Sequence, residues 1–319
     1  MIKKTAAVIL TLFMLCTLFC ACGEYNFSTD GFHIVCTVFP QYDWVKNIVG
    51  ATENVNIEVL LDSGTDLHSY QPTASDIVTM ASADVFIYIG GESDKWIEDV
   101  LKTTANENTY VLNLMESLGE ENLYCVEEIG EEHTHNDSNA HHHTHDEHIW
   151  LSPKKAITLT ETIKNVLCEK DTVNKASYEE NYSLYLSKLQ ALDKSYEDGI
   201  KNANKDTVIF ADRFPFIYLT KDYGINYHAA FSGCSSDSEA SFETVTRLAN
   251  KTDELSASAL LITETSDAAV ANTVKNSTKN KNQQILTMNS LQSVSKDKLG
   301  SSYIEIMEEN LNILKTALS

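Results

Sequence analysis

Two histidines, His68 and His148, have the residue type and the setting of metal ligands. His68 lies in the segment GTDLHSYQP, and His148 lies in DEHIWLSP. A neutral imidazole nitrogen is a common ligand for Zn²⁺ and for other transition metals. Ile149 and Trp150 follow His148 directly, and burial of these apolar residues would hold the imidazole in place. The two histidines therefore predict half of a tetrahedral metal site.

A histidine-rich segment, residues 131–147, runs directly into His148. The histidines in this segment are His133, His135, His141, His142, His143 and His145. The surrounding stretch, 119–147, is acidic and has no apolar periodicity, which is typical of a long exposed loop. Several weak imidazole ligands beside a tight site would raise the local metal concentration. We interpret the segment as a metal collector that favours zinc, copper or nickel over manganese; the alternative is a solvated low-complexity insertion.

The elements around these histidines follow an α/β pattern. His68 lies between an apolar run at 55–61 and a helical pattern at 72–83, so it is expected at the carboxyl end of a strand, where open α/β sheets bind ligands. Pro72 is expected at the start of that helix. Nearly continuous apolar runs predict strands that are covered on both faces. These runs are 32–39, 55–61, 84–90 and 109–114, then 207–211, 225–231, 259–264 and 283–288. Because strands alternate with helices, both groups predict parallel sheets.

A long helix is expected between the two groups of strands. Residues 174–204 contain no Pro and no Gly before Gly199, and about 30 helical residues would span about 45 Å. The predicted fold is α/β, with two parallel-sheet lobes joined by a long rigid linking helix and with the ligand in the interlobe cleft. We expect an N-terminal lobe at 32–173, the linking helix at 174–204 and a C-terminal lobe at 205–319.

The first 21 residues have the pattern of a signal peptide. Lys3 and Lys4 precede an apolar run, which is shorter than the roughly 20 residues that a transmembrane helix needs. The run ends in TLFCACG, where Ala21 precedes Cys22, and this segment resembles a bacterial lipobox. The pattern predicts cleavage after residue 21, lipidation of Cys22 and a tether at 22–31. The protein would then be anchored by lipid to the extracytoplasmic face of the cell membrane.

Charge and cysteine spacing narrow the functional classes. The net charge of -22 argues against nucleic acid as a partner and against a basic membrane-binding face. The cysteines after Cys22 are Cys36, Cys125, Cys168 and Cys234. They form no CxxC motif, so neither a redox motif nor a zinc ribbon is indicated. The extracytoplasmic location permits a disulfide, but the spacing does not identify one.

The segments GTDLHSYQPT and HIWLSP, the histidine-rich insertion before the second segment and the helix-linked lobes together resemble a known family. It comprises the zinc- and manganese-binding lipoproteins of bacterial ABC importers, the ZnuA/TroA-like group of cluster A-I. The resemblance covers nearly the whole mature chain. It implies a metal in the interlobe cleft, with His68 and His148 as ligands from the N-terminal lobe. It also implies that the partners are ABC permease and ATPase subunits. We expect the protein to be a monomer and to have no enzymatic activity.

The C-terminal lobe departs from the family pattern. Members usually carry a histidine after the first strand of this lobe, where this chain has FADRFPF, with Ala211 or Arg213 in that place. A late carboxylate is replaced by the segment MNSLQS. The candidate metal ligands are therefore His68, His148, Asp212 and Glu264, with His228 and Gln292 also possible.

Each candidate also has a structural explanation. Asp212 could form an ion pair or a helix cap beside Arg213. Glu264 could orient a histidine as a hydrogen-bond acceptor. His228 could be packed within its lobe, and His33 could be a residue at the edge of a strand.

The expected function is capture of Zn²⁺ outside the membrane and delivery to an ABC importer. Two alternatives use the same fold and ligands, namely a manganese-binding importer component and an extracytoplasmic zinc buffer without a dedicated transporter. The sequence contains no HExxH and no GxSxG motif, which argues against a metalloenzyme or a hydrolase.

Overall fold

The computed structural model describes residues 31–104, 109–126, 144–233, 240–294 and 300–319, and Phe32–Ser319 forms one compact unit. The predicted signal peptide, Cys22, nearly all of the tether and most of the histidine-rich segment lie outside the described residues. Within the described ranges, no helix is both long enough and apolar enough to cross a membrane.

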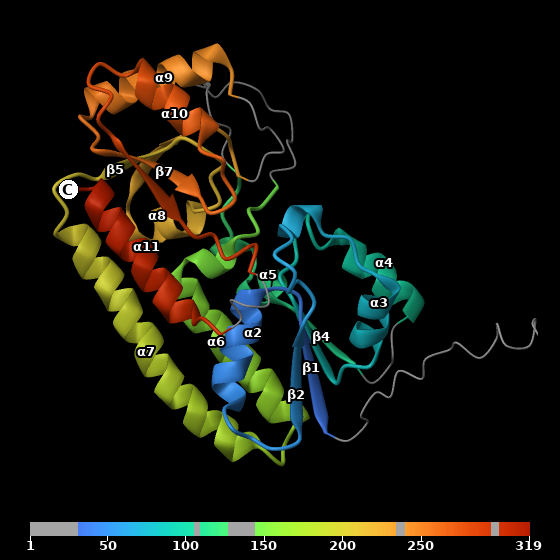
Figure 1. The fold of residues 1–319 in the computed structure, drawn as a ribbon. Coiled ribbons are helices and arrows are strands. Elements are labelled where there is room, and N and C mark those ends of the chain that lie inside the picture. The colour runs from blue at the N-terminus through green and yellow to red at the C-terminus, as the bar shows by residue number, and fades with distance from the viewer. Residues whose placement is uncertain (1–30, 105–108, 127–143, 234–239, 295–299) are drawn as a thin grey trace, which may run out of the picture. The chain divides into compact units, whose positions relative to one another are not determined.

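Two four-stranded sheets form the centres of the two lobes (Figure 1). The first sheet has the order β2-β1-β3-β4, with strands β1 (Phe32–Cys36), β2 (Val55–Val59), β3 (Val85–Tyr88) and β4 (Tyr110–Asn113). The second has the order β6-β5-β7-β8, with strands β5 (Thr207–Phe210), β6 (Asn226–Ala229), β7 (Ala259–Thr263) and β8 (Gln284–Met288). All neighbouring strands are parallel. The predicted α/β fold with two parallel-sheet lobes is confirmed.

Helices surround both sheets. Those in the N-terminal half are α2 (Phe39–Val49), α3 (Ala74–Ala81), α4 (Lys95–Thr104), α5 (Leu114–Leu118) and α6 (Pro153–Lys170). Those that follow are α7 (Lys175–Lys201), α8 (Ile217–Tyr223), α9 (Phe242–Glu254), α10 (Ala269–Ser277) and α11 (Tyr303–Ala317). Local sequence explains where several of them begin, because Ser152, Ser241 and Ser302 each accept a backbone N–H at the helix start. Thr73 caps α3 and exchanges hydrogen bonds with Asp76, so Pro72 lies before the cap rather than inside the helix.

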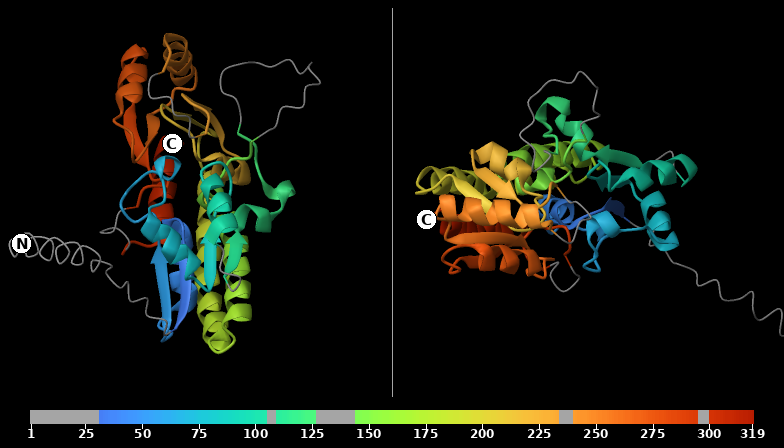
Figure 2. Two further views of the ribbon diagram at one scale, coloured as in Figure 1. Left: turned by 90° about the vertical axis from the view of Figure 1, so that its right-hand side faces the viewer. Right: turned by 90° about the horizontal axis from the view of Figure 1, so that it is seen from above.

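The helix α7 lies against elements of both lobes. One stripe of its surface is buried, with residues Tyr178, Tyr182, Tyr185, Leu189, Leu192 and Tyr196 at helical spacing. This stripe faces α2 and α6 in the first lobe and α11 in the second, and Figure 2 shows α6 and α7 side by side. The helix falls within the predicted range 174–204, and its 27 residues extend for about 40 Å.

Candidate metal site

The loop after β2 presents His68 at the carboxyl end of that strand. A short 3₁₀ helix, η2 (Leu67–Ser69), carries the histidine. The Asp66 carboxylate accepts the His68 backbone N–H at 2.9 Å, and the Leu67 side chain is buried. The cap and the buried neighbour hold the backbone that carries His68 in one conformation.

A second short 3₁₀ helix, η4 (Ile149–Leu151), positions His148, the residue directly before it. The Trp150 indole N–H donates to the Ser290 carbonyl at 2.9 Å, and the Tyr303 hydroxyl donates to the Trp150 carbonyl at 2.7 Å. Trp150 is fully buried and His148 is 1 % exposed. The apolar residues after His148 therefore anchor it, as the sequence predicts, and they do so through contacts that reach the second lobe.

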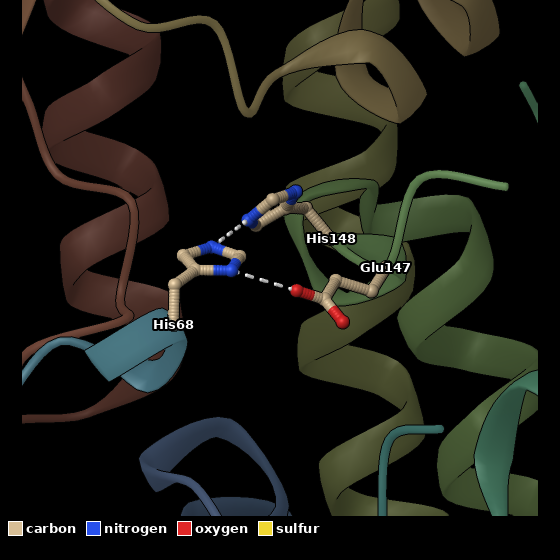
Figure 3. Close-up of side chains that lie close together, drawn as sticks. All are labelled: His68, Glu147 and His148. Carbon is tan, nitrogen blue, oxygen red and sulfur yellow. Dashed lines mark hydrogen bonds and ion pairs between the residues drawn. The ribbon is translucent and has the colours of Figure 1, made fainter. Parts of the chain in front are cut away.

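The two imidazoles point toward each other (Figure 3). The Nε2 atoms of His68 and His148 are 3.3 Å apart. Two nitrogens that bind one tetrahedral zinc ion, each about 2.05 Å from the metal, are separated by about 3.3 Å. The spacing of the two nitrogens thus fits a zinc ion bound by both.

A carboxylate lies against the other nitrogen of each ring. The Asp146 Oδ1 atom is 2.8 Å from Nδ1 of His148, and the Glu147 Oε1 atom is 3.0 Å from Nδ1 of His68. When Nδ1–H donates to a carboxylate, the neutral ring keeps its lone pair on Nε2, where a metal can bind. Both histidines therefore have the orientation that a metal ligand needs, and the carboxylates favour the tautomer that leaves Nε2 open to a metal.

Ser93 completes the surroundings of Glu147. Its backbone N–H donates to Glu147 Oε2 at 3.0 Å, and its hydroxyl donates to Oε1 of the same carboxylate and lies 2.7 Å from Nδ1 of His68. Burial alone would raise the pKa of Glu147, but the hydrogen bond from His68, the neighbouring His148 and the hydrogen bond from Ser93 together lower it below its ordinary value. Glu147 therefore stays ionised beside the two imidazoles.

The loop after β3 brings Ser93 to this position. Gly91 has a φ of +92°, and a Cβ atom there would lie 2.8 Å from Glu147 Oε2, so only glycine fits. The buried Asp94 carboxylate accepts the backbone N–H groups of Ile89 and Gly90, both at 3.0 Å. Burial is the main cause that raises the pKa of Asp94 to about 7.

Among the described residues, His68, Glu147 and His148 form a group of possible metal ligands, with ligand atoms within 4.8 Å of one another. Both histidines are predicted from the sequence, whereas Glu147, Asp146 and Ser93 are not. The two carboxylates directly precede His148 in DEHIW, and the general pairing of metal-binding histidines with carboxylates could have revealed them. No spacing pattern in the sequence connects Ser93 with the site.

The candidate ligands of the second lobe lie outside this group. Asp212 Oδ2 accepts the backbone N–H of Thr263 at 2.8 Å and its hydroxyl at 2.6 Å. Glu264 accepts the backbone N–H of Ser290 at 2.8 Å and its hydroxyl at 2.7 Å. Both carboxylates hold neighbouring segments together in this way, and their roles as ligands stay predictions.

The other candidate residues, His228 and Gln292, also lie outside the group around the two histidines of the site. His228 lies on β6, where burial, Lys251 and Arg247 lower its pKa, and Gln292 is buried. His33 Nε2 lies 3.4 Å from Glu58 on the neighbouring strand. Neither His228 nor Gln292 belongs to the group around His68 and His148.

Arg213 reaches across to the loop that carries His68. Its guanidinium lies 3.6 Å from the Asp66 carboxylate and donates to the Thr265 hydroxyl at 2.9 Å. The residue that stands near the place of the family's usual third histidine therefore contacts the cap of η2. This contact joins a segment of the second lobe to the metal-site loop of the first.

Comparisons with known proteins show a family and several relatives that this chain resembles over most of its length. The model of the family ZnuA, described as zinc-uptake complex component A, periplasmic, matches residues 34–317. The zinc-binding lipoprotein AdcA of Streptococcus pneumoniae is 33 % identical over 310 residues, which are 96 % of this chain and 60 % of the relative. The high-affinity zinc uptake system protein ZnuA of Bacillus subtilis is 32 % identical over 298 residues, which are 93 % of this chain and 90 % of the relative. This chain thus spans 60 % of the length of the first relative.

Solved structures agree with the sequence relatives. The Zn(II)-bound ZnuA-like domain of Streptococcus pneumoniae AdcA matches with a TM-score of 0.71 and 27 % identity, over 90 % of this chain and 99 % of that domain. The metal-dependent lipoprotein YcdH of Bacillus subtilis matches with a TM-score of 0.73 and 28 % identity, over 90 % of this chain and all of that one.

Proposed function

The chain belongs to the ZnuA family of periplasmic zinc-uptake components, and from this premise we propose that it captures Zn²⁺ outside the cytoplasmic membrane and delivers it to an ABC importer. In this role zinc is the cargo, which the site must bind tightly and later release. Such a role requires no chemical reaction, and we infer that the protein is a binding component rather than an enzyme.

The observation that carries the proposal is the convergence of the two Nε2 atoms, 3.3 Å apart. Each ring has a carboxylate at its other nitrogen, so His68 and His148 would bind zinc through Nε2. Glu147 would supply negative charge beside the metal and hold the His68 ring. Water or a carboxylate of the second lobe would occupy the remaining positions, and an exchangeable ligand there would help release.

The proposed location follows from the N-terminal pattern and from the relatives. The AdcA relative is named a lipoprotein, which supports lipidation of Cys22 after removal of residues 1–21. The proposed partners are the permease and ATPase subunits of the importer, and we propose that the protein acts as a monomer. Residues 131–147 would collect zinc beside the site.

Two alternative functions would use the same site, namely manganese import and zinc buffering. The two imidazole ligands favour zinc over manganese. Manganese prefers oxygen ligands, whereas imidazole suits zinc, so two imidazoles favour a zinc cargo over a manganese cargo. An extracytoplasmic zinc buffer would use the same ligands without a permease. Pull-down of the importer subunits by the lipidated protein would support the importer role, and their absence from the bound fraction would favour the buffer.

The test is calorimetric titration with zinc and with manganese of the chain from residue 23, which keeps the compact unit Phe32–Ser319. We expect one tight zinc site that is weakened at least about 100-fold by His68→Ala or His148→Ala. His228→Ala is the matched control and should bind as the unchanged chain does.

Deletion of residues 131–143 tests the collector separately. The tight site should remain, and the weak sites formed by the five deleted histidines, His133, His135, His141, His142 and His143, should disappear. If the deletion abolished tight binding, or if both histidine variants bound zinc normally, the proposed site would be wrong. Tighter binding of manganese than of zinc would instead support the manganese alternative.

A further inference from the structure

A short antiparallel bridge closes the base of the histidine-rich segment. Cys125 pairs with His145 in this bridge. The backbone N–H of Val126 donates to the Thr144 carbonyl at 3.0 Å, and that of Asp146 donates to the Tyr124 carbonyl at 2.8 Å. The hydrogen bonds thus flank the pair, so Cys125 and His145 are a non-hydrogen-bonded pair. In such pairs the Cα atoms are about 4.5 Å apart and the two side chains lie on the same face.

We propose that Cys125 and His145 form a second metal site, separate from the His68–His148 site. A thiolate and an imidazole on one face are donors that suit Zn²⁺ and softer divalent cations, whereas Mn²⁺ and Mg²⁺ prefer oxygen. Binding would form one metal–sulfur and one metal–nitrogen bond and release the thiol proton to solvent. Water would supply the other ligands, so the site would be weaker than the first.

Among the cysteines that the structure describes, Cys125 has the surroundings that best suit a metal ligand. Cys125 and His145 are both partly exposed, so a cation can reach them from solvent. Cys36 and Cys168 are also free, but both are buried. Burial raises the pKa of each of these two thiols, which disfavours the thiolate that a metal needs.

The bridge is held firmly beside the first site. The Tyr124 hydroxyl donates to Asp222 at 2.7 Å, and the Tyr218 hydroxyl donates to the Asp146 carbonyl at 2.8 Å. Both partners come from α8 of the second lobe. His145 precedes His148 by three residues, which span at most about 10 Å. A cation on the pair would therefore lie close to the His68–His148 site.

Titration with Co²⁺ in oxygen-free buffer tests the proposal, because a thiolate ligand gives a charge-transfer band in the near ultraviolet that nitrogen and oxygen ligands do not give. The chain from residue 23 is used, with Cys234→Ser in every variant. We expect a thiolate band that Cys125→Ser abolishes and that His145→Ala shifts to at least about tenfold higher Co²⁺ concentration. Cys168→Ser is the matched control and should leave the band unchanged.

The biological role of the second site rests on the proposed function, but the thiolate band tests the second site separately from tight zinc binding. His68→Ala should remove tight zinc binding but keep the thiolate band. If the chain gives no thiolate band, or if the band survives Cys125→Ser, the second site is wrong, whatever the first site does. If the band is present while tight zinc binding is absent, the second site stands and the proposed cargo function fails.

Discussion

Asp146 Oδ1 lies 2.8 Å from Nδ1 of His148 and also accepts the backbone N–H of the same histidine at 2.9 Å. One buried carboxylate oxygen thus fixes both the ring and the backbone of the residue that we propose as a ligand. The next residue, Glu147, contacts Nδ1 of His68. Two consecutive carboxylates therefore orient two histidines that come from distant parts of the chain.

The substitution Asp146→Asn should weaken zinc binding. The amide oxygen of the new side chain could still accept a hydrogen bond from Nδ1–H of His148. The negative charge that makes Nε2 of His148 a stronger metal ligand would be lost. The expected loss of zinc affinity is about 10-fold to 100-fold, measured by competition with a chelator. Asp171→Asn is the comparison variant, because its buried carboxylate accepts from Asn174 and Tyr178 and contacts neither histidine. Equal losses in the two variants would mean that Asp146 has no special role.

The substitution Glu147→Gln should act through His68. If the amide NH₂ group of the new side chain faces His68, it would donate to Nδ1, which moves the ring proton to Nε2 and blocks the metal-binding nitrogen. We expect a loss of zinc affinity of about 10-fold to 100-fold, with a smaller loss for Ser93→Ala. Histidine tautomers can be assigned by nitrogen NMR in both proteins. An unchanged tautomer with unchanged affinity would exclude this role for Glu147.

Both histidines of the site could be predicted because the cause is local in the sequence. His68 follows an apolar strand and precedes a helix, and His148 precedes residues that are fully buried in the structure. The alternation of strands and helices also predicts two parallel sheets, because each parallel strand needs a crossover before the next. Burial and connectivity of this kind can be predicted from a short segment of sequence without knowledge of its distant contacts.

The rest of the site depends on contacts between segments that are far apart in the chain. Ser93 lies beside Glu147 because of the conformation of the loop after β3. Asp94 accepts two backbone N–H groups of this loop, and the backbone at Gly91 lies close to the Glu147 side chain. Glu264 could not be distinguished from a ligand by its place after a strand, since a carboxylate there can face the cleft or a neighbouring loop. The structure shows that it accepts two hydrogen bonds from Ser290.

Replacement of Glu264 by glutamine should separate these two roles. Both oxygens of Glu264 accept from Ser290, whose carbonyl accepts the Trp150 indole N–H. A glutamine amide cannot accept at both atoms, so unfolding free energy should fall by about 1–3 kcal/mol. If Glu264 is only a structural acceptor, zinc affinity should change less than about threefold, far below the effect of changing a ligand.

Urea unfolding and zinc titration of Glu264→Gln give the two numbers. Ser290→Ala removes one donor to the same carboxylate and is the matched variant for stability. A loss of zinc affinity as large as that of His148→Ala, with stability unchanged, would make Glu264 a ligand in the metal-bound state.

Asp43 should make stability depend on pH. This buried residue of α2 accepts the Tyr303 backbone N–H of α11 at 3.1 Å and the Tyr185 hydroxyl of α7 at 3.4 Å. Burial raises its pKa to about 6, although Tyr303, Lys46 and Tyr185 act in the opposite direction. The folded chain therefore binds this proton more tightly than the unfolded chain, in which the pKa is about 3.9.

The raised pKa fixes the sign of the effect. Between about pH 4 and pH 6 the folded state holds more protons at this site, so the contribution of Asp43 to stability falls as pH rises. Above about pH 6 the ionised group costs up to about 3 kcal/mol relative to acid conditions. Asp43→Asn cannot ionise, so its unfolding free energy should rise relative to that of the unchanged chain across this window.

Urea unfolding of both proteins at several pH values measures that difference directly, because the titration of all other groups is common to both. Asp99→Asn, at a side chain that is 84 % exposed, is the matched control for the replacement of a carboxylate by an amide at the surface. A difference for Asp43→Asn that stays constant from about pH 4 to pH 7 would mean that the hydrogen bonds from Tyr303 and Tyr185 only balance the effect of burial on the Asp43 carboxylate. A difference that falls with rising pH would mean that they stabilise its charged form more than burial disfavours it.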